Sequence, residues 1–320
     1  MTREPGIPAL KGGEDVNTSS ESLPPDRAGS PSSLIVTFAG CYLRQIGGWI
    51  AVADLIHLLE LVGVPAPAVR QSVLRLKSRG FLSAERRGTT AGYTLTEAGR
   101  ADLEPGDRRI FRYGQADLAD GWVLAVFSVP ESRRNHRHQL RSQLGWLGFG
   151  TVGSGVWAAP AALTGPAREL LSGSGLDGYV TWFHADALDP VDVSAWWDLA
   201  ALRAQYEAFL QRWEAGAADG AMTEPPMAHA AVTESPVDDR PATEPSGGDA
   251  FARYLRLVDD WRLFPRIDPG LPAELLPTDW PGPAAWQSFR DLRARWSDPG
   301  LAYLRSVTGS DEVAAARVPG

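Results

Sequence analysis

The sequence of 320 residues predicts an α+β protein built from three folded units. Three hydrophobic patterns predict this fold class. Residues 33–96 show three helical apolar patterns and then a short hairpin, residues 121–187 show the order strand, helix, strand, strand, helix, strand, and residues 188–215 and 249–310 show helical patterns only. We therefore expect an N-terminal winged helix-turn-helix, a central ferredoxin-like α/β domain and a C-terminal helical domain.

The N-terminal unit carries three helices in quick succession, and a glycine ends each of them. In the third helix, Val69, Val73 and Leu76 recur at helical spacing, so they share one face and are expected to be buried. The opposite side, which includes Gln71 and Leu74, is then exposed. This arrangement is typical of a recognition helix that enters the major groove of DNA.

A hairpin is expected directly after this helix. Residues 81–83 predict a first strand and residues 93–96 its return, with residues 86–92 as the bridging loop. A hairpin next to a recognition helix is the wing of a winged helix, and it contacts the DNA backbone or the minor groove.

The distribution of charge favours DNA binding by this unit. The chain has a net charge of -8, whereas the stretch from Ser33 to Tyr113 contains 11 Arg and Lys against 7 Asp and Glu, a net charge of +4. An acidic protein with one basic module binds DNA through that module and is repelled elsewhere. The alternative is that the basic residues form only a solvated surface.

The basic residues of the module have two expected roles. Arg70 and Gln71 lie early in the third helix and are candidates for base contacts, since Arg pairs with guanine and Gln with adenine in bidentate geometry. The expected phosphate contacts come from the rest of the helix and from the wing: Arg75, Lys77, Arg86 and Arg87.

Three further segments lie outside the folded units. Residues 1–32 and 216–248 predict a disordered arm and a disordered acidic insertion, because neither segment buries enough apolar surface to offset its ordering. Residues 97–120 predict a connector that begins with at least one helical turn. A basic strip follows this helix and consists of Arg108, Arg109 and Arg112. The strip could contact DNA phosphates or dock against the next domain.

The central domain contains one basic helix, which Ser132 is expected to cap and which buries Leu140, Leu144 and Leu147. Its basic edge, at spacing i, i+3 and i+7, consists of Arg134, Arg137 and Arg141. This edge could hold a phosphate-bearing ligand or form a solvated flank. The neighbouring residues His136 and His138 project to different sides of the helix, so no metal site is expected.

Other features narrow the class of protein. The sequence contains no run of about 18 apolar residues, so no membrane helix is expected. The first residues lack the apolar segment of a secretion signal. The single cysteine, Cys41, cannot form an internal disulfide and is expected in the core. We therefore expect a cytoplasmic protein that associates with the nucleoid through its DNA-binding module.

Three blocks of sequence carry a family signature. The front block is VRQSVLRLKSRGFL followed by RRG and YTLTEAG, the middle block is LGWLGFGTVGSGVWAAP, and the C-terminal block is WRLFPRIDPGLPAELLPTDWPG. The positions that carry the resemblance in the middle and C-terminal blocks are Gly148, Phe149, Gly150, Trp157, Pro160, Asp268, Pro269, Leu271, Pro272, Leu275, Leu276, Pro277, Trp280, Pro281 and Gly282. Together, and in this order, the blocks resemble the PaaX family, repressors of phenylacetate degradation operons.

The resemblance implies a homodimeric transcriptional repressor that binds an operator in double-stranded DNA. It further implies release from the operator by an aryl-CoA thioester, phenylacetyl-CoA in the best-known members, and no other cofactor. Such a ligand requires cations for its phosphates and an apolar slot for its acyl end. The candidate residues are Arg134, Arg137, Arg141, Arg262 and Arg266 for the phosphates, and Trp157, Trp261 and Trp280 for the slot. The arm and the insertion depart from the family pattern.

Two alternatives come from other classes of protein. The central domain is similar to Cas2-type nucleases, which have an acidic residue at the end of the first strand, where this chain has Val129, Pro130 and Glu131. A metal-dependent nuclease would need a second carboxylate there. The other alternative is a winged helix that binds only proteins, for which a basic module is not required.

Overall fold

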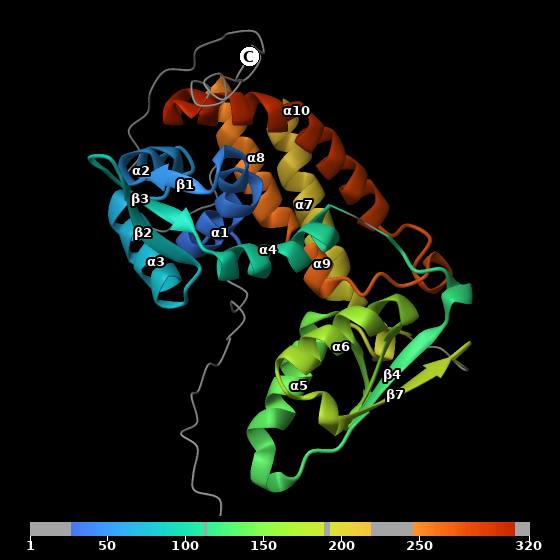
Figure 1. Ribbon diagram of the computed structural model, residues 1–320. Helices are drawn as coiled ribbons and strands as arrows, with labels where there is room; N and C mark the ends of the chain where they lie inside the picture. The colour runs from blue at the N-terminus through green and yellow to red at the C-terminus, as the bar shows by residue number, and fades with distance from the viewer. Residues whose placement is uncertain (1–26, 112–113, 189–192, 219–245, 311–320) are drawn as a thin grey trace, which may run out of the picture.

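The computed structural model describes residues 27–111, 114–188, 193–218 and 246–310, and these have the predicted α+β architecture. The winged helix and the C-terminal helices lie side by side, and the central domain lies below them (Figure 1). No helix within the described residues is long and apolar enough to cross a membrane.

The two segments predicted to be disordered overlap described helices at their ends. Helix α1 (Pro31–Cys41) begins before the expected start at Ser33, because Ser30 caps it by accepting a hydrogen bond from the Ser33 N–H at 3.2 Å. Around the insertion, helix α7 (Leu199–Ala218) ends later and helix α8 (Gly247–Trp261) begins earlier than expected. The rest of both segments lies outside the described residues.

The N-terminal unit is a winged helix with a three-stranded antiparallel sheet in the order β1-β3-β2. Its further elements are β1 (Trp49–Ala51), α2 (Val52–Glu60), α3 (Ala66–Ser78), β2 (Leu82–Arg87) and β3 (Thr90–Leu95). The sequence pattern does not predict β1, because a strand of 3 residues is too short to show alternation. A side chain at Gly92 would collide with the Ile50 carbonyl, which explains why a glycine lies where β3 pairs with β1.

The wing is a longer hairpin than the sequence predicts. Arg86 and Arg87 belong to strand β2 and pair with Ala91 and Thr90 of β3, so the prediction of a loop over residues 86–92 is wrong. Gly88 turns the chain with a φ of 58°, a left-handed value typical of two-residue hairpin turns. Both faces of the ribbon tip are exposed, and therefore no apolar alternation marks the strands.

The central domain has the predicted order of elements and one four-stranded antiparallel sheet. Its elements are β4 (Trp122–Phe127), α5 (Arg134–Trp146), β5 (Gly150–Gly153), β6 (Val156–Pro160), α6 (Thr164–Gly173) and β7 (Val180–Ala185). The strand order β5-β6-β4-β7 is ferredoxin-like. Leu140, Leu144 and Leu147 are buried as predicted. Ser132 lies in a short 3₁₀ turn before α5 and does not cap the helix.

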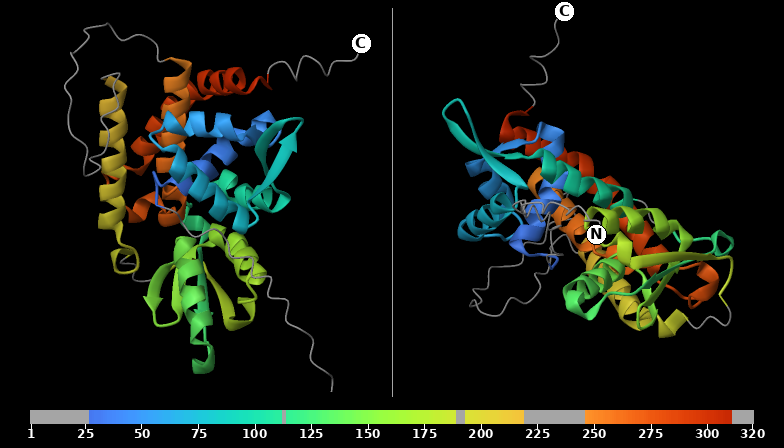
Figure 2. Two further views of the ribbon diagram at one scale, coloured as in Figure 1. Left: turned by 90° about the vertical axis from the view of Figure 1, so that its left-hand side faces the viewer. Right: turned by 60° about the horizontal axis from the view of Figure 1, so that its bottom comes forward.

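The C-terminal domain consists of helices. It contains α7, α8, α9 (Phe264–Ile267) and α10 (Gly282–Thr308). Figure 2 shows α8 between α7 on one side and the winged helix on the other. Helix α7 begins at Leu199, where the Asp198 carboxylate caps it by accepting a hydrogen bond from the Ala201 N–H at 2.9 Å.

The connector contains a full helix, α4 (Glu97–Ile110), which Thr96 caps by accepting a hydrogen bond from the Gly99 N–H at 2.9 Å. Its end docks on the C-terminal helices. The Ile110 carbonyl accepts a hydrogen bond from the Trp261 indole at 3.0 Å, and Phe111 stacks on Phe289 with 6.5 Å between ring centroids. The side chains of the basic strip, Arg108, Arg109 and Arg112, lie outside the part of the chain that the structure describes.

One continuous core joins the winged helix to the C-terminal helices. Tyr42, directly after α1, stacks on Phe251 of α8 with 4.7 Å between ring centroids. Gly300 lets α10 approach this pair, because a Cβ at Gly300 would stand 2.5 Å from the Tyr42 hydroxyl. The winged helix and the C-terminal helices therefore pack as one body.

A buried ionic network holds α1 against α8 within this core. The carboxylate of Asp259, 1% exposed, accepts hydrogen bonds from the hydroxyls of Ser33 and Thr37, both at 2.6 Å, and from the Gly29 N–H at 2.7 Å. Arg262 pairs with Asp259 at 3.1 Å and donates to the Ser33 hydroxyl at 2.7 Å. Both buried charges are thus paired and hydrogen-bonded, the condition under which charges are tolerated in a core.

We expect Asp259→Ala to lower the free energy of unfolding by about 3–5 kcal/mol, because the change leaves Arg262 buried without its counter-charge. Urea unfolding of the full chain measures this loss. The matched control is Asp298→Ala at an exposed position of α10, for which the expected change is within about 0.5 kcal/mol. Equal effects of the two substitutions would contradict a structural role for the network.

Candidate nucleic-acid interface

Helix α3 presents a polar face outward and an apolar face inward. Val69, Val73 and Leu76 are each 1% exposed, as the sequence predicts. Of the predicted DNA contacts on this helix, Arg70, Gln71 and Arg75 are exposed and Lys77 is half-buried. These four side chains therefore lie on a single helix that is open to a partner along its outer side.

The two wing arginines differ in how they are held. They are adjacent on β2 and therefore point to opposite faces of the ribbon. Arg87 forms an ion pair with Glu85 at 2.9 Å, and its guanidinium lies 4.9 Å from the centre of the Trp49 ring. Arg86 donates to the neutral carbonyl of Thr89 at 2.9 Å. The charge of Arg86 is thus the more available of the two for a phosphate.

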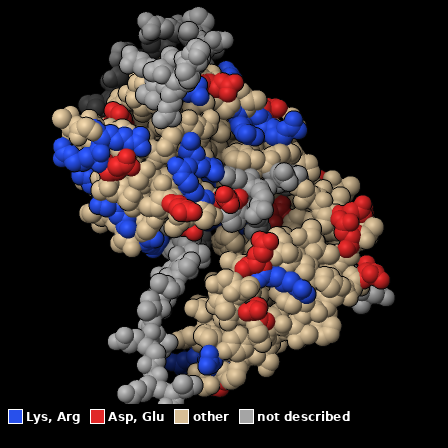
Figure 3. Space-filling view, viewed as in Figure 1, with Lys and Arg blue, Asp and Glu red and all other residues tan. Residues whose placement is uncertain are grey.

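Lys and Arg side chains gather over α3 and the β2–β3 hairpin, along the left edge of the face in Figure 3. The sequence analysis assigned no role in DNA binding to two exposed residues, one in α3 and one directly after it. Arg79 follows α3 directly and adds a further cation to this edge. Leu74 is 64% exposed among the polar residues of the outer face. The position of Leu74 opposite the buried stripe of α3 was the signal that could have identified it as part of the outer face.

The five cations predicted for an effector do not form one group. Arg262 belongs to the buried network with Asp259 and is 7% exposed. Arg266 lies at the contact between α9 and α5, with its guanidinium 5.5 Å from the centre of the Trp146 ring. The other three cations lie along α5.

On α5, Arg134 and Arg141 are exposed. Arg137 is half-buried, donates to the Val129 carbonyl at 2.8 Å and pairs with Glu131 at 3.1 Å. The basic edge expected from the sequence is therefore present, with its middle member held against the start of the helix.

The three tryptophans predicted for an acyl slot lie in separate places. Trp157 belongs to the core of the central domain, and Trp261, 1% exposed, stacks on Phe289 in the core of the C-terminal helices with 4.7 Å between ring centroids. Trp280 is half-buried, 6.1 Å from the Tyr206 ring. The described structure therefore has no single slot lined by all three.

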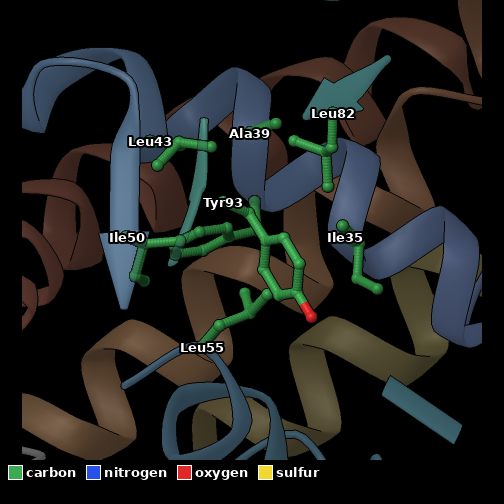
Figure 4. Close-up of a pocket in the computed structure, with 8 residues that line it drawn as sticks. Ile35, Ala39, Leu43, Ile50, Leu55, Leu82 and Tyr93 are labelled. Atoms are coloured by element: carbon green, nitrogen blue, oxygen red, sulfur yellow. The ribbon is translucent and has the colours of Figure 1, made fainter. Parts of the chain in front are cut away.

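A small apolar cavity lies inside the winged helix (Figure 4). Its lining residues are Ile35, Phe38, Ala39, Leu43, Ile50, Leu55, Leu82 and Tyr93. It leaves room of about 10 Å³, which is about one water molecule. An aryl group does not fit in this space, so the cavity is a packing feature and not an effector site.

The glycine motif of the middle block and the proline motif of the C-terminal block meet at one junction. Gly148 has a φ of 91°, and a Cβ there would stand 3.1 Å from the Cα of Pro269. The Trp197 indole donates to the Gly148 carbonyl at 2.8 Å, and its ring covers Gly150. These close contacts require glycine at both positions.

Asp268 organises the other side of this junction. Its carboxylate accepts hydrogen bonds from the Tyr206 hydroxyl at 2.5 Å and from the Gly270 N–H at 2.8 Å. The Gly270 carbonyl in turn accepts the Ala116 N–H at 2.8 Å, which ties the end of the connector to the motif. Burial raises the pKa of the Asp268 carboxyl, and the two hydrogen bonds oppose this shift.

No group of three or more His, Cys, Asp or Glu side chains that could hold a metal ion occurs within the described ranges. At the position discussed for Cas2-type nucleases, Val129 is buried and Glu131 pairs with Arg137. Glu131 is therefore already engaged by a basic side chain.

A winged helix with a basic outer recognition face is the architecture of a DNA-binding transcription regulator. Three family models match the chain in order: PaaX-like protein at residues 30–99, PaaX protein central Cas2-like domain at 115–196, and PaaX-like protein C-terminal domain at 197–306. The chain therefore belongs to the PaaX family, as the sequence blocks predict.

Two known proteins are similar over most of the chain. The Transcriptional repressor PaaX of Escherichia coli (strain K12) is 28% identical over 298 residues, which cover 91% of this chain and 88% of the relative. The solved structure of the uncharacterized protein Rv0674 from Mycobacterium tuberculosis has a TM-score of 0.52 at 21% identity, covers 88% of this chain, and 99% of that chain is matched. The second likeness concerns the fold, and the first supports a transcriptional repressor, a regulator rather than an enzyme.

We expect the stability contributed by Asp268 to fall as pH rises. Because its pKa is raised in the folded state, the folded protein holds this proton more tightly than the unfolded chain, whose Asp pKa is about 3.9. The unfolding free energy of the wild type, relative to Asp268→Asn, is then highest below about pH 4 and declines as pH rises through the raised pKa. Urea unfolding between pH 4 and 8 tests this, and a difference that grows with pH would contradict it.

Proposed function

We propose that the protein is a transcriptional repressor that binds an operator with α3 and the β2–β3 wing. The observation that carries this proposal is the exposure of Arg70, Gln71, Arg75 and Arg86 on one net-positive module of an acidic chain. The function in the name of the Escherichia coli relative supports it. In this proposal the protein acts in the cytoplasm on the nucleoid.

Fluorescence anisotropy of the full chain with labelled promoter DNA, with and without magnesium, tests the proposal. We expect reversible retention that random DNA does not match. Cleavage of the DNA in magnesium would instead support a nuclease, and the absence of any interaction would support a protein-binding module. Either of those two outcomes contradicts the proposed function.

Substitutions distinguish residues that contact bases from residues that contact phosphates, because only the former affect the operator more than random DNA. Gln71→Ala is expected to weaken binding to the operator by roughly tenfold and to leave binding to random DNA unchanged, because it removes a base contact. Salt titrations of operator and random DNA measure both affinities. An equal loss on the two DNAs would contradict the base-reading role of Gln71.

Arg86→Ala is expected to weaken binding to operator and random DNA alike and to reduce the slope of log K against log salt by about 1, because one phosphate contact is lost. The matched control is Arg87→Ala, whose effect is expected to be smaller because Glu85 already pairs with Arg87. A larger salt effect from Arg87→Ala would reverse the assignment.

We further propose that the protein acts as a homodimer. Two winged helices about one DNA turn apart read a palindromic site, which one winged helix alone does not do. Sedimentation of the operator complex would show two chains per site. One chain per site at saturation would contradict this part of the proposal.

The proposed effector is an aryl-CoA thioester such as phenylacetyl-CoA, as the family resemblance implies. Asp259 already neutralises Arg262, and Arg266 lies over the Trp146 ring at the contact between α9 and α5. The exposed candidates for CoA phosphates are therefore Arg134 and Arg141 of α5. Trp280 is the least buried of the three candidate tryptophans. Binding releases the operator only to the extent that the ligand prefers the DNA-free arrangement.

A titration of the operator complex with phenylacetyl-CoA and a panel of other acyl-CoAs tests this sensing role. We expect one of them to lower operator affinity at least tenfold. Arg141→Ala is expected to raise the effector concentration required and to leave operator affinity unchanged, since Arg141 lies outside the winged helix. An operator complex insensitive to the whole panel would refute the sensing half and leave DNA binding intact.

A further inference from the structure

Leu74 stands out on the outer face of α3. It is 64% exposed, more than any other large hydrophobic side chain among the described residues. It lies one helical turn from Arg70 and Gln71 on one side and from Ser78 on the other. The fold does not require a leucine here, because α3 packs through Val69, Val73 and Leu76 on the opposite side.

The charges around Leu74 indicate what covers it. Arg70, Arg75 and Lys77 surround the leucine on the same helix. An apolar protein surface placed on Leu74 would bring these cations out of water without counter-charges. The major groove of DNA instead brings phosphates to the flanking cations and offers one apolar group on its floor, the 5-methyl group of thymine.

We infer that Leu74 is a specificity-determining residue, which contacts the 5-methyl group of a thymine in the operator. This inference rests on the proposed DNA-binding function and deepens it. Gln71 and Leu74 are three residues apart, which is about 4.5 Å along the helix axis. A base-pair step is about 3.4 Å. Leu74 therefore reads a base pair next to the adenine that Gln71 is proposed to read.

The probe is a set of DNA sites in which single thymines are replaced by deoxyuridine, which removes only the methyl group. The parent site is selected from a random library with the full-length protein. For the wild type, we expect one such replacement to weaken binding about fourfold, the effect of exposing one buried methyl-sized group. For Leu74→Ala, the same replacement is expected to have no effect.

Two controls separate this inference from loss of folding. Leu74→Ala is expected to keep the thermal midpoint of the wild type, because an exposed side chain is removed. Leu61→Ala, at another exposed leucine of the winged helix outside α3, is expected to retain the fourfold penalty.

The possible failures are distinguishable. If the library yields no enriched site, the proposed DNA-binding function fails. If a site is enriched and every deoxyuridine is neutral for the wild type, or if Leu74→Ala retains the penalty, the role of Leu74 is overturned while DNA binding stands.

Discussion

The paired buried charges of Asp259 and Arg262 fix the winged helix on the C-terminal helices. Through Ser33 and Thr37 they hold the first helix of the DNA-binding unit against α8. The stacked rings of Tyr42 and Phe251 continue the same contact. A buried carboxylate that loses any of these partners is strongly disfavoured. The winged helix therefore has one orientation on the C-terminal helices, with α3 on the side away from α7 and α10 (Figure 1).

Because the winged helix is fixed on the C-terminal helices, we expect movement to occur where the central domain joins them. The central domain has its own core and meets the rest of the chain through contacts such as Gly148 on Pro269 and Arg266 over Trp146. The middle and C-terminal sequence blocks that mark the family meet at this junction. In the proposed sensing mechanism, a ligand bound along α5 acts on this junction rather than on α3, and it changes the distance between the two winged helices of the proposed dimer.

The elements whose residues face one core were predictable from sequence, since Val69, Val73 and Leu76 of α3 recur at helical spacing. The wing strands were not predictable in full, because both faces of the hairpin are exposed to solvent at Arg86 and Arg87 and no apolar alternation marks the strand. The hydrogen bond of Ser33 to Asp259 spans 226 residues, and no local pattern reveals it. For the same reason Arg262 resembled a free cation in the sequence. The exposed side of α3 followed from helical geometry alone, and so the exposure of Arg70, Gln71 and Arg75 could be predicted residue by residue.

The central claim is that α3 and the wing form the surface that binds DNA. Hydrogen–deuterium exchange of the full protein with and without its operator tests this claim most directly. We expect DNA to slow exchange at the backbone amides of α3 and of the β2–β3 hairpin, and to leave the amides of α5 and β7 unchanged. Protection confined to the central domain, with α3 unaffected, would contradict the account.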